Sequence, residues 1–316
     1  MRIIFMGTPE FAVPALNTLA EHHDVAAVVT APDKPAGRGK KLGESAVKKA
    51  AAAAGIPVLQ PLKLKDPVFH KELEAYAADL FVVVAFRMLP EAVWAMPPKG
   101  TINLHGSLLP AYRGAAPINR AIMNGEKETG LTTFFIERDI DTGAVIDRAT
   151  LPIGTDENAG SLHDRMMERG ASLLLNTVNK IESGKAEGQP QDALSGKEPQ
   201  PSAPKIFRDD CRIDWSRSAT EVHNHIRGLS PYPSAFTEFT EKDGTIIPLK
   251  IHTARLTNTP ATGAPGSFFP EGDTLTVNTG EGQISVIELQ APGKKRMATA
   301  DYLRGYTFPA NATFTA

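Results

Sequence analysis

The chain has 316 residues, of which 41% are hydrophobic and 22% are charged, as in an ordinary globular protein. One domain usually has roughly 100–200 residues, so this length favours two domains. With a formal net charge of -2, any polyanionic partner would have to bind local basic patches rather than the molecule as a whole. The single cysteine, Cys211, excludes an intrachain disulfide and a cysteine-based metal site.

The first residues carry no targeting signal. The apolar stretch at residues 3–6 is too short for a signal peptide and has neither a small-residue cleavage site nor the Arg/Ser-rich character of a transit peptide. No apolar run approaches the roughly 18–20 residues that cross a bilayer. We therefore expect a cytoplasmic protein with no membrane partner.

Residues 1–183 alternate short apolar runs with helical patterns. The runs at 3–6, 25–29, 57–59, 80–85, 101–105, 131–136 and 144–151 predict strands, and the patterns at 11–21, 45–54, 117–123 and 160–183 predict helices. This alternation is typical of a doubly wound, mostly parallel α/β sheet. In such sheets, ligands bind outside the carboxyl ends of the strands.

The composition changes after residue 183. Residues 184–204 are rich in Gly, Pro, Gln, Ser and Lys, which predicts a linker. Beyond a predicted helix at 219–227, short alternating runs occur at 236–239, 246–251, 275–277 and 284–289, separated by glycine turns. The pattern predicts a small antiparallel β-barrel, so that the expected domains are residues 1–183 and 205–316.

Two polar residues end the predicted strand Thr101–His105. Side chains at positions i and i+2 of a strand share a face, so Asn103 and His105 should point the same way. Each needs a partner, because unpaired burial of a polar group costs about 1–3 kcal/mol. The spacing alone leaves a satisfied core pair and a functional pair equally open.

Two nearby segments are candidates for function. The loop at residues 106–117 follows His105 directly, and its small residues would let a ligand approach the backbone. Asp141 lies in a turn before Gly143, where glycine permits a tight conformation. An aspartate in this position usually hydrogen-bonds its own backbone, so the local pattern favours a structural role for Asp141.

Basic residues gather in two places. Residues 33–49 contain six basic residues and only two acidic ones, and a second cluster occupies residues 294–296. A run of charge is most often a solvated face, but two clusters with interspersed glycines are candidates for phosphate contacts. A dinucleotide fingerprint, a Walker A sequence, a nucleophile elbow and a histidine pair with zinc spacing are all absent from the sequence.

The motifs Asn103-x-His105, Ser107-Leu108-Leu109-Pro110 and Asp141-Thr142-Gly143 together resemble the folate-dependent formyltransferases. Further matching segments extend the resemblance over nearly the whole chain, to the branch of that family that acts on the initiator methionyl-tRNA. These segments are residues 7–11, 32–41, 113–118, 213–215 and 292–295. The resemblance implies a Rossmann-like sheet followed by an OB-like β-barrel that binds tRNA.

The resemblance also implies roles for particular residues. Asn103, His105 and Asp141 would be catalytic, in a direct attack of the aminoacyl amine on the formyl group of 10-formyltetrahydrofolate through a tetrahedral intermediate, with no metal. The residues implied to bind folate are Ser107, Leu108, Leu109, Pro110, Phe86 and Leu89. The residues implied to bind tRNA are Arg38, Lys40, Lys41, Lys294, Lys295 and Arg296.

One segment departs from the family, and other functions stay open. Arg87 stands where the family often has a glycine, which affects the expected shape of the pterin pocket. The alternatives are a formyltransferase for a small amine (a ribonucleotide or an amino sugar), a folate hydrolase, and a non-catalytic RNA-binding protein. We expect a monomer.

Overall fold

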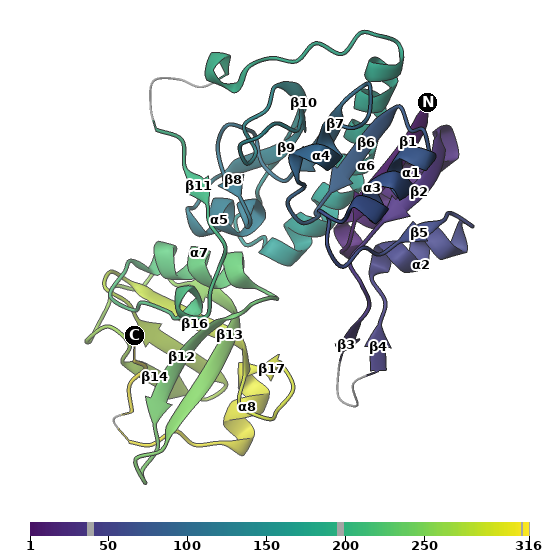
Figure 1. Ribbon diagram of the computed structural model, residues 1–316. Helices are drawn as coiled ribbons and strands as arrows, with labels where there is room; N and C mark the ends of the chain where they lie inside the picture. The colour runs from purple at the N-terminus through teal and green to yellow at the C-terminus, as the bar shows by residue number, and fades with distance from the viewer. Residues whose placement is uncertain (37–40, 195–198, 311, 316) are drawn as a thin grey trace. The chain divides into compact units, whose positions relative to one another are not determined.

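The computed structural model describes residues 1–36, 41–194, 199–310 and 312–315, which form two compact units (Figure 1). The first unit contains Met1–Gly114, Thr129–Leu151 and His163–Ser202, and the second contains Ala115–Glu128, Pro152–Leu162 and Ala203–Ala316. The domain boundaries expected from composition stay a prediction. None of the described helices is long and apolar enough to cross a membrane.

A seven-stranded sheet forms the centre of the first unit, in the order β10-β9-β7-β6-β1-β2-β5. Its strands are β1 (Arg2–Gly7), β2 (Asp24–Val29), β5 (Val58–Leu59), β6 (Leu80–Val84), β7 (Thr101–His105), β9 (Glu128–Phe135) and β10 (Val145–Pro152). β1 runs parallel to β2 and β6, and β7 runs parallel to β6, whereas β9 is antiparallel to β7. The predicted mostly parallel α/β sheet is confirmed.

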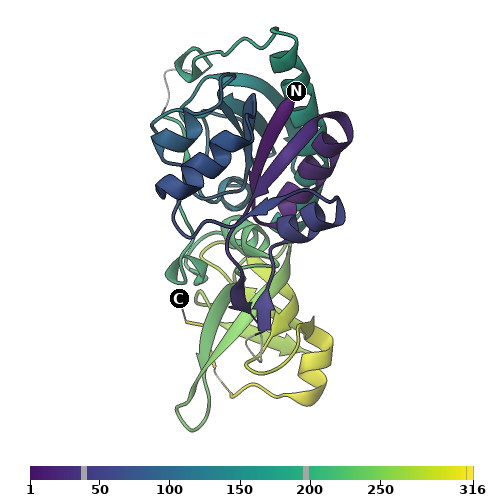
Figure 2. The same ribbon diagram turned by 45° about the vertical axis from the view of Figure 1, so that its right-hand side comes forward.

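Helices cover both faces of this sheet (Figure 2). α3 (Pro67–Ala75) and α4 (Glu91–Trp94) lie on one face, and α1 (Val13–His22), α2 (Ala46–Ala53) and α6 (Ala159–Glu182) lie on the other. On the first face, Phe69 and Val93 join a buried cluster with Ile4 and Val83 of the sheet. The sequence analysis did not predict α3 and α4, which are short.

Several shorter elements complete the first unit. They are the 3-10 helices η1 (Glu10–Ala12) and η2 (Gln191–Ala193) and the strands β3 (Lys34–Ala36), β4 (Lys41–Gly43), β8 (Arg113–Gly114) and β11 (Ser202–Ala203). β3 and β4 pair in antiparallel fashion within the basic stretch at residues 33–49. Arg38 and Lys40, two of the predicted tRNA-binding residues, lie outside the described residues.

The second unit is built on a six-stranded antiparallel sheet in the order β12-β13-β16-β15-β14, with β17 paired to β16. The strands are β12 (Ala235–Thr240), β13 (Ile246–Leu256), β14 (Phe268–Glu271), β15 (Thr274–Asn278), β16 (Gln283–Gln290) and β17 (Met297–Ala298). The helices are α5 (Pro117–Met123), η3 (Asp209–Cys211), α7 (Ala219–Leu229) and α8 (Thr299–Gly305). The expected helices at 117–123 and 219–227 correspond to α5 and α7.

The end of the chain joins the two edge strands of this sheet. Phe314 N donates a hydrogen bond of 2.8 Å to Gly266 O, next to β14, and Thr315 N donates one of 2.8 Å to Glu238 O of β12. Bridges pair Thr313 with Ser267 and Thr315 with Glu238. The predicted small antiparallel barrel is confirmed, and its closure depends on the last residues of the chain.

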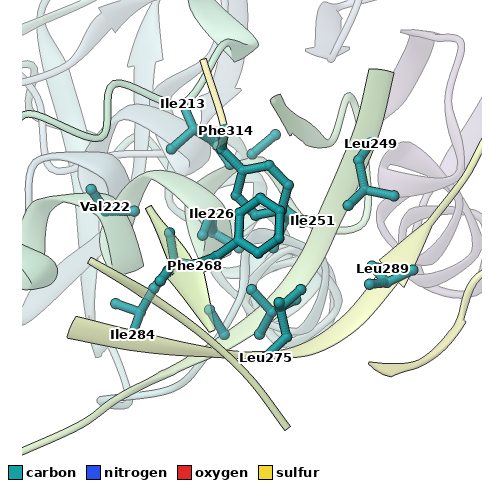
Figure 3. Close-up of a cluster of buried hydrophobic side chains, with 14 of the residues drawn as sticks. Ile213, Val222, Ile226, Leu249, Ile251, Phe268, Leu275, Ile284, Leu289 and Phe314 are labelled. Atoms are coloured by element: carbon teal, nitrogen blue, oxygen red, sulfur yellow. The ribbon is translucent and has the colours of Figure 1, made fainter. Parts of the chain in front are cut away.

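Buried hydrophobic side chains fill this barrel, among them the rings of Phe268 and Phe314 (Figure 3). The rings of Phe268 and Phe314 lie 4.3 Å apart between centroids, and Trp215 stacks on Phe314 at 5.6 Å. The indole Nε1 of Trp215 donates to Thr237 Oγ1 at 2.9 Å, so its burial leaves no polar atom unpaired. Cys211 is buried in the same cluster, and burial raises the pKa of its thiol, which favours the unreactive protonated form.

We expect Phe314→Ala to lower the free energy of unfolding by about 3–5 kcal/mol, because it removes a ring from the packed centre of the barrel. Phe269→Ala is the matched control, since this ring is 46% exposed, and we expect a change within about 0.5 kcal/mol. Urea unfolding measures both. Equal effects of the two substitutions would contradict the packing described above.

Candidate active site

The end of β7 places two polar side chains on one face of the sheet. Asn103 pairs with Val83 of β6, and paired residues of neighbouring strands point to the same face. That face is covered by α3 and α4. On the other face, Leu104 packs under α6, where a Cβ at Gly170 would lie 2.8 Å from it. The side-chain directions predicted from the period of two agree with this arrangement.

Asn103 is partly exposed at this position. Among the residues that the structure describes, none forms a hydrogen bond with its side-chain amide. A primary amide carries two N–H donors and one oxygen acceptor. Asn103 is therefore available to donate to a bound ligand without breaking an existing bond.

His105 is 6% exposed, and both ring nitrogens face an oxygen of the protein. Nε2 lies 2.9 Å from Tyr112 O, and Nδ1 lies 3.7 Å from Asp141 Oδ2. A carbonyl oxygen only accepts, so Nε2 carries a hydrogen. Nδ1 is the ring nitrogen that faces the Asp141 carboxylate, at a separation longer than a hydrogen bond.

Asp141 reaches His105 from a segment about 36 residues further along the chain. Its side chain is 14% exposed, and Oδ2 accepts a hydrogen bond of 3.0 Å from Gly114 N. Asp141 has φ +56°, a region that few residues other than glycine adopt. The sequence pattern led us to expect that the Asp141 carboxylate accepts a hydrogen bond from its own turn. That expectation is wrong, because the carboxylate accepts its hydrogen bond from the loop that follows His105.

Gly143 is required by the packing of the Asp141 turn. A Cβ at this position would lie 1.7 Å from Phe135 O, a backbone atom that cannot rotate away. The sequence analysis attributed this glycine to a tight turn. The structure adds a second reason, which is the close approach of the turn to the end of β9.

The predicted folate-binding loop at residues 107–110 is held by one threonine. Thr132 Oγ1 donates to Ser107 O at 2.7 Å and accepts from Leu109 N at 3.0 Å. Ser107 Oγ donates to Ala111 O at 2.6 Å, and the side chain of Leu109 is fully buried. Leu108 instead lines a cavity of about 500 Å³ together with residues 145–148. The loop is therefore rigid, and its side chains point in different directions.

The predicted pterin segment follows β6. Leu89 is buried in the cluster beside the sheet, and Phe86 is partly buried against the same cluster. The Arg87 guanidinium lies 5.6 Å from the centre of the Phe86 ring and donates to the carbonyls of Pro61 and Leu62. Burial lowers the pKa of Arg87 from its ordinary value. This arginine connects two loops at the position where the family often has a glycine.

The basic residues that the structure describes differ in how they are paired. The Arg296 guanidinium donates to the Glu288 carboxylate, and the Lys48 ammonium donates to both Asp33 and Glu44. Lys294 and Lys295 are exposed. Of the predicted tRNA-binding group, Arg296 has its charge offset by a neighbouring carboxylate, whereas Lys294 and Lys295 face solvent. Among the described residues, no group of His, Cys, Asp and Glu could hold a metal ion.

The sequence analysis missed one residue of this site. The Gln191 side chain is buried and donates to the main-chain oxygens of Asp141 and Gly143. It belongs to a polar segment whose composition is typical of solvent-exposed chain, so no local pattern distinguished it.

We expect Gly143→Ala to lower the free energy of unfolding by about 1–3 kcal/mol, because the added methyl group forces Phe135 or the turn to move. Gly305→Ala is the control, since a Cβ there would have no heavy atom within 4 Å. Urea unfolding compares the two proteins with the unsubstituted chain. If Gly143→Ala is as stable as the control, the turn can move to accept a methyl group without a loss of unfolding free energy, which would contradict this prediction.

Comparisons with known proteins show the family of this chain. The family models for formyl transferase and for the formyl transferase C-terminal domain match residues 1–178 and 205–307. The methionyl-tRNA formyltransferase of Bacteroides fragilis is 48% identical over 97% of this chain and 95% of its own length. That of Porphyromonas gingivalis is 49% identical over 98% of this chain and 97% of its own length.

A solved structure shares the fold. The N-formyltransferase from Helicobacter canadensis, in complex with folinic acid and dTDP-3-aminofucose, has a TM-score of 0.64 at 22% identity, covering 90% of this chain and 97% of its own. The full-length similarity to the curated relatives is much closer. The chain therefore belongs to the formyl transferase family and, within it, to the methionyl-tRNA formyltransferases.

Proposed function

We propose that this protein transfers the formyl group of 10-formyltetrahydrofolate to the amino group of initiator methionyl-tRNA, for translation initiation. The observation that carries the proposal is the approach of the Asp141 carboxylate to His105, which shares a strand face with Asn103 at the carboxyl end of β7. The full-length relatives named for this activity support the choice of acceptor.

The site fits a formyl donor, because the Asn103 amide has no partner among the described residues and can donate to a carbonyl oxygen. When bound, the folate supplies the electrophilic formyl carbon. Asn103 stabilises negative charge on the formyl oxygen as the amine attacks, and the loss of one such donor typically costs about a hundredfold in rate. Residues 107–110 present a rigid loop for the folate, and Phe86 and Leu89 shape its pterin end.

His105 and Asp141 handle protons in this proposal. The Tyr112 carbonyl fixes the imidazole, so its Nδ1 edge stays turned toward the Asp141 carboxylate. The separation of 3.7 Å between Nδ1 and Oδ2 is longer than a hydrogen bond. The proton that the amine releases can pass to this pair, directly or through a water molecule. Neither residue needs to bond covalently to the formyl group.

The alternatives are less well supported. An amino-sugar or ribonucleotide acceptor is compatible with the fold, since the Helicobacter canadensis enzyme shares it at 22% identity. The relatives at 48–49% identity over almost the whole chain favour the tRNA acceptor instead. A non-catalytic RNA-binding protein would have no need for a buried imidazole held between a carbonyl and a carboxylate. The cytoplasmic location and the monomeric state stay predictions.

Formyl transfer is tested with labelled 10-formyltetrahydrofolate and charged initiator tRNA, with a ribonucleotide, an amino sugar and water alone as competing acceptors. We expect labelled formyl-methionyl-tRNA as the main product. His105→Ala and Asp141→Asn should each lower kcat by about 10²–10⁴-fold, because each removes a group that moves or orients the proton. The proteins should remain folded by circular dichroism.

Asp139→Asn is the matched control for these variants, because it removes a carboxylate from the exposed part of the same turn. We expect nearly unchanged turnover. Near-normal transfer by His105→Ala or by Asp141→Asn would reject the assigned roles. Efficient transfer to a small amine without transfer to the tRNA would instead favour the alternative acceptors.

Neutralising Arg38, Lys40 and Lys41 together should weaken tRNA binding and reduce its dependence on salt. Each lost phosphate contact lowers the slope of log K against log salt concentration by roughly 0.7–0.9. Filter binding at several salt concentrations measures this slope. A variant that neutralises the exposed Lys63, Lys65 and Lys71 is the control for net charge. An unchanged slope in the first variant would contradict a phosphate contact by these three residues.

A further inference from the structure

Gln191 is a buried side chain whose amide is fully engaged. It is 3% exposed, and its Nε2 donates to Asp141 O at 2.8 Å and to Gly143 O at 2.9 Å. Its Oε1 accepts from Arg113 Nε at 3.0 Å and from Arg113 Nη2 at 2.7 Å. Both N–H donors and both oxygen lone pairs are therefore used within the protein.

Only a glutamine side chain meets these requirements. Glutamate has no N–H for the two carbonyls, and lysine or arginine has no acceptor for Arg113. Asparagine has the right groups but is shorter by one methylene. The backbone around Gln191 is fixed by the sheet, because Val145 N donates to Gln189 O and Gln189 N donates to Val145 O, both at 2.8 Å.

The two segments that Gln191 joins are the two that contact His105. One carries Asp141, whose carboxylate faces Nδ1, and the other carries Tyr112, whose carbonyl accepts from Nε2. Arg113, the partner of the Gln191 oxygen, directly follows Tyr112. Both Asp141 (φ +56°) and Tyr112 (φ +60°) adopt the left-handed conformation. Such residues cost about 1–3 kcal/mol each and persist only where their surroundings hold them.

We propose that Gln191 is a positioning residue for formyl transfer, holding the Asp141 carboxylate and the Tyr112 carbonyl at the two nitrogens of His105. It does not touch the reacting atoms. The inference rests on the proposed function, since the positions that it maintains matter for turnover only if His105 and Asp141 act in the reaction.

The test uses Gln191→Met and Gln191→Glu in the full chain. Gln191→Met keeps the length and removes every hydrogen bond. Gln191→Glu keeps an acceptor for Arg113 but turns a carboxylate toward two carbonyl oxygens, and its ion pair with Arg113 favours a folded protein. Both should lower kcat by about 10–100-fold, since a displacement of about 1 Å at a catalytic group can cost a hundredfold. KM for donor and tRNA should change less than about threefold, because the Gln191 amide is buried and its hydrogen-bonding groups are used within the protein.

Gln189→Met is the matched control, because it is the same substitution two residues away on an exposed side chain. It should leave kcat unchanged. Thermal unfolding shows whether each variant is folded. If Gln191→Met does not fold, the comparison is made with Gln191→Glu alone. A kcat within about twofold of the unsubstituted enzyme in a folded Gln191 variant would overturn the proposal.

A double substitution separates positioning from general stability. If Gln191 acts through Asp141, Gln191→Glu should add less than about threefold to the loss caused by Asp141→Asn, because residues that act as a unit are not additive. If the losses of kcat in the two single variants multiply in the double variant, the inference is overturned. The ¹⁵N signals of the His105 ring give a readout without substrate, and they should shift in Gln191→Glu but not in Gln189→Met. If the unsubstituted enzyme does not formylate methionyl-tRNA, the proposed function fails, and these signals still test the positioning.

Discussion

The burial of one imidazole at the end of a central strand is the constraint on which the rest of the site depends. His105 is almost fully removed from solvent, and its two ring nitrogens face oxygens that come from different segments. Tyr112 and Asp141, which supply these oxygens, both adopt the uncommon left-handed conformation. The loop after β7 and the turn after β9 therefore both surround a single side chain.

Maintaining that shape requires close packing around the turn. Gly143 approaches Phe135 O so closely that no side chain fits, and Gln191 ties the turn to the segment that carries Arg113. Asn103 differs from these residues, because its amide has no partner among the described residues. The protein has a firmly held imidazole and carboxylate next to a free hydrogen-bond donor, which suits the stabilisation of a developing negative charge.

The second unit depends on a different constraint, the unpaired edges of an antiparallel sheet. β12 and β14 would expose a row of backbone groups, and residues 313–315 pair with β12 and with the segment directly before β14. Phe314 occupies the centre of the barrel between these bridges (Figure 3). The same short segment thus closes the sheet and completes its core. Lys294 and Lys295, which we expect to contact tRNA, lie between β16 and β17 of this unit.

The sequence by itself determined the local structure of this protein: the strand that places Asn103 and His105 on one face, the boundaries of α5, the glycine of the Asp141 turn and the family motifs. These depend on side-chain period and turn chemistry, which neighbouring residues determine. Only the tertiary structure decided that Asp141 reaches His105 rather than its own turn, that Gln191 supports both of their segments, and that Phe314 closes the barrel. Each of these contacts joins residues far apart in the chain, and such pairs depend on how strands and loops pack, which no local pattern contains.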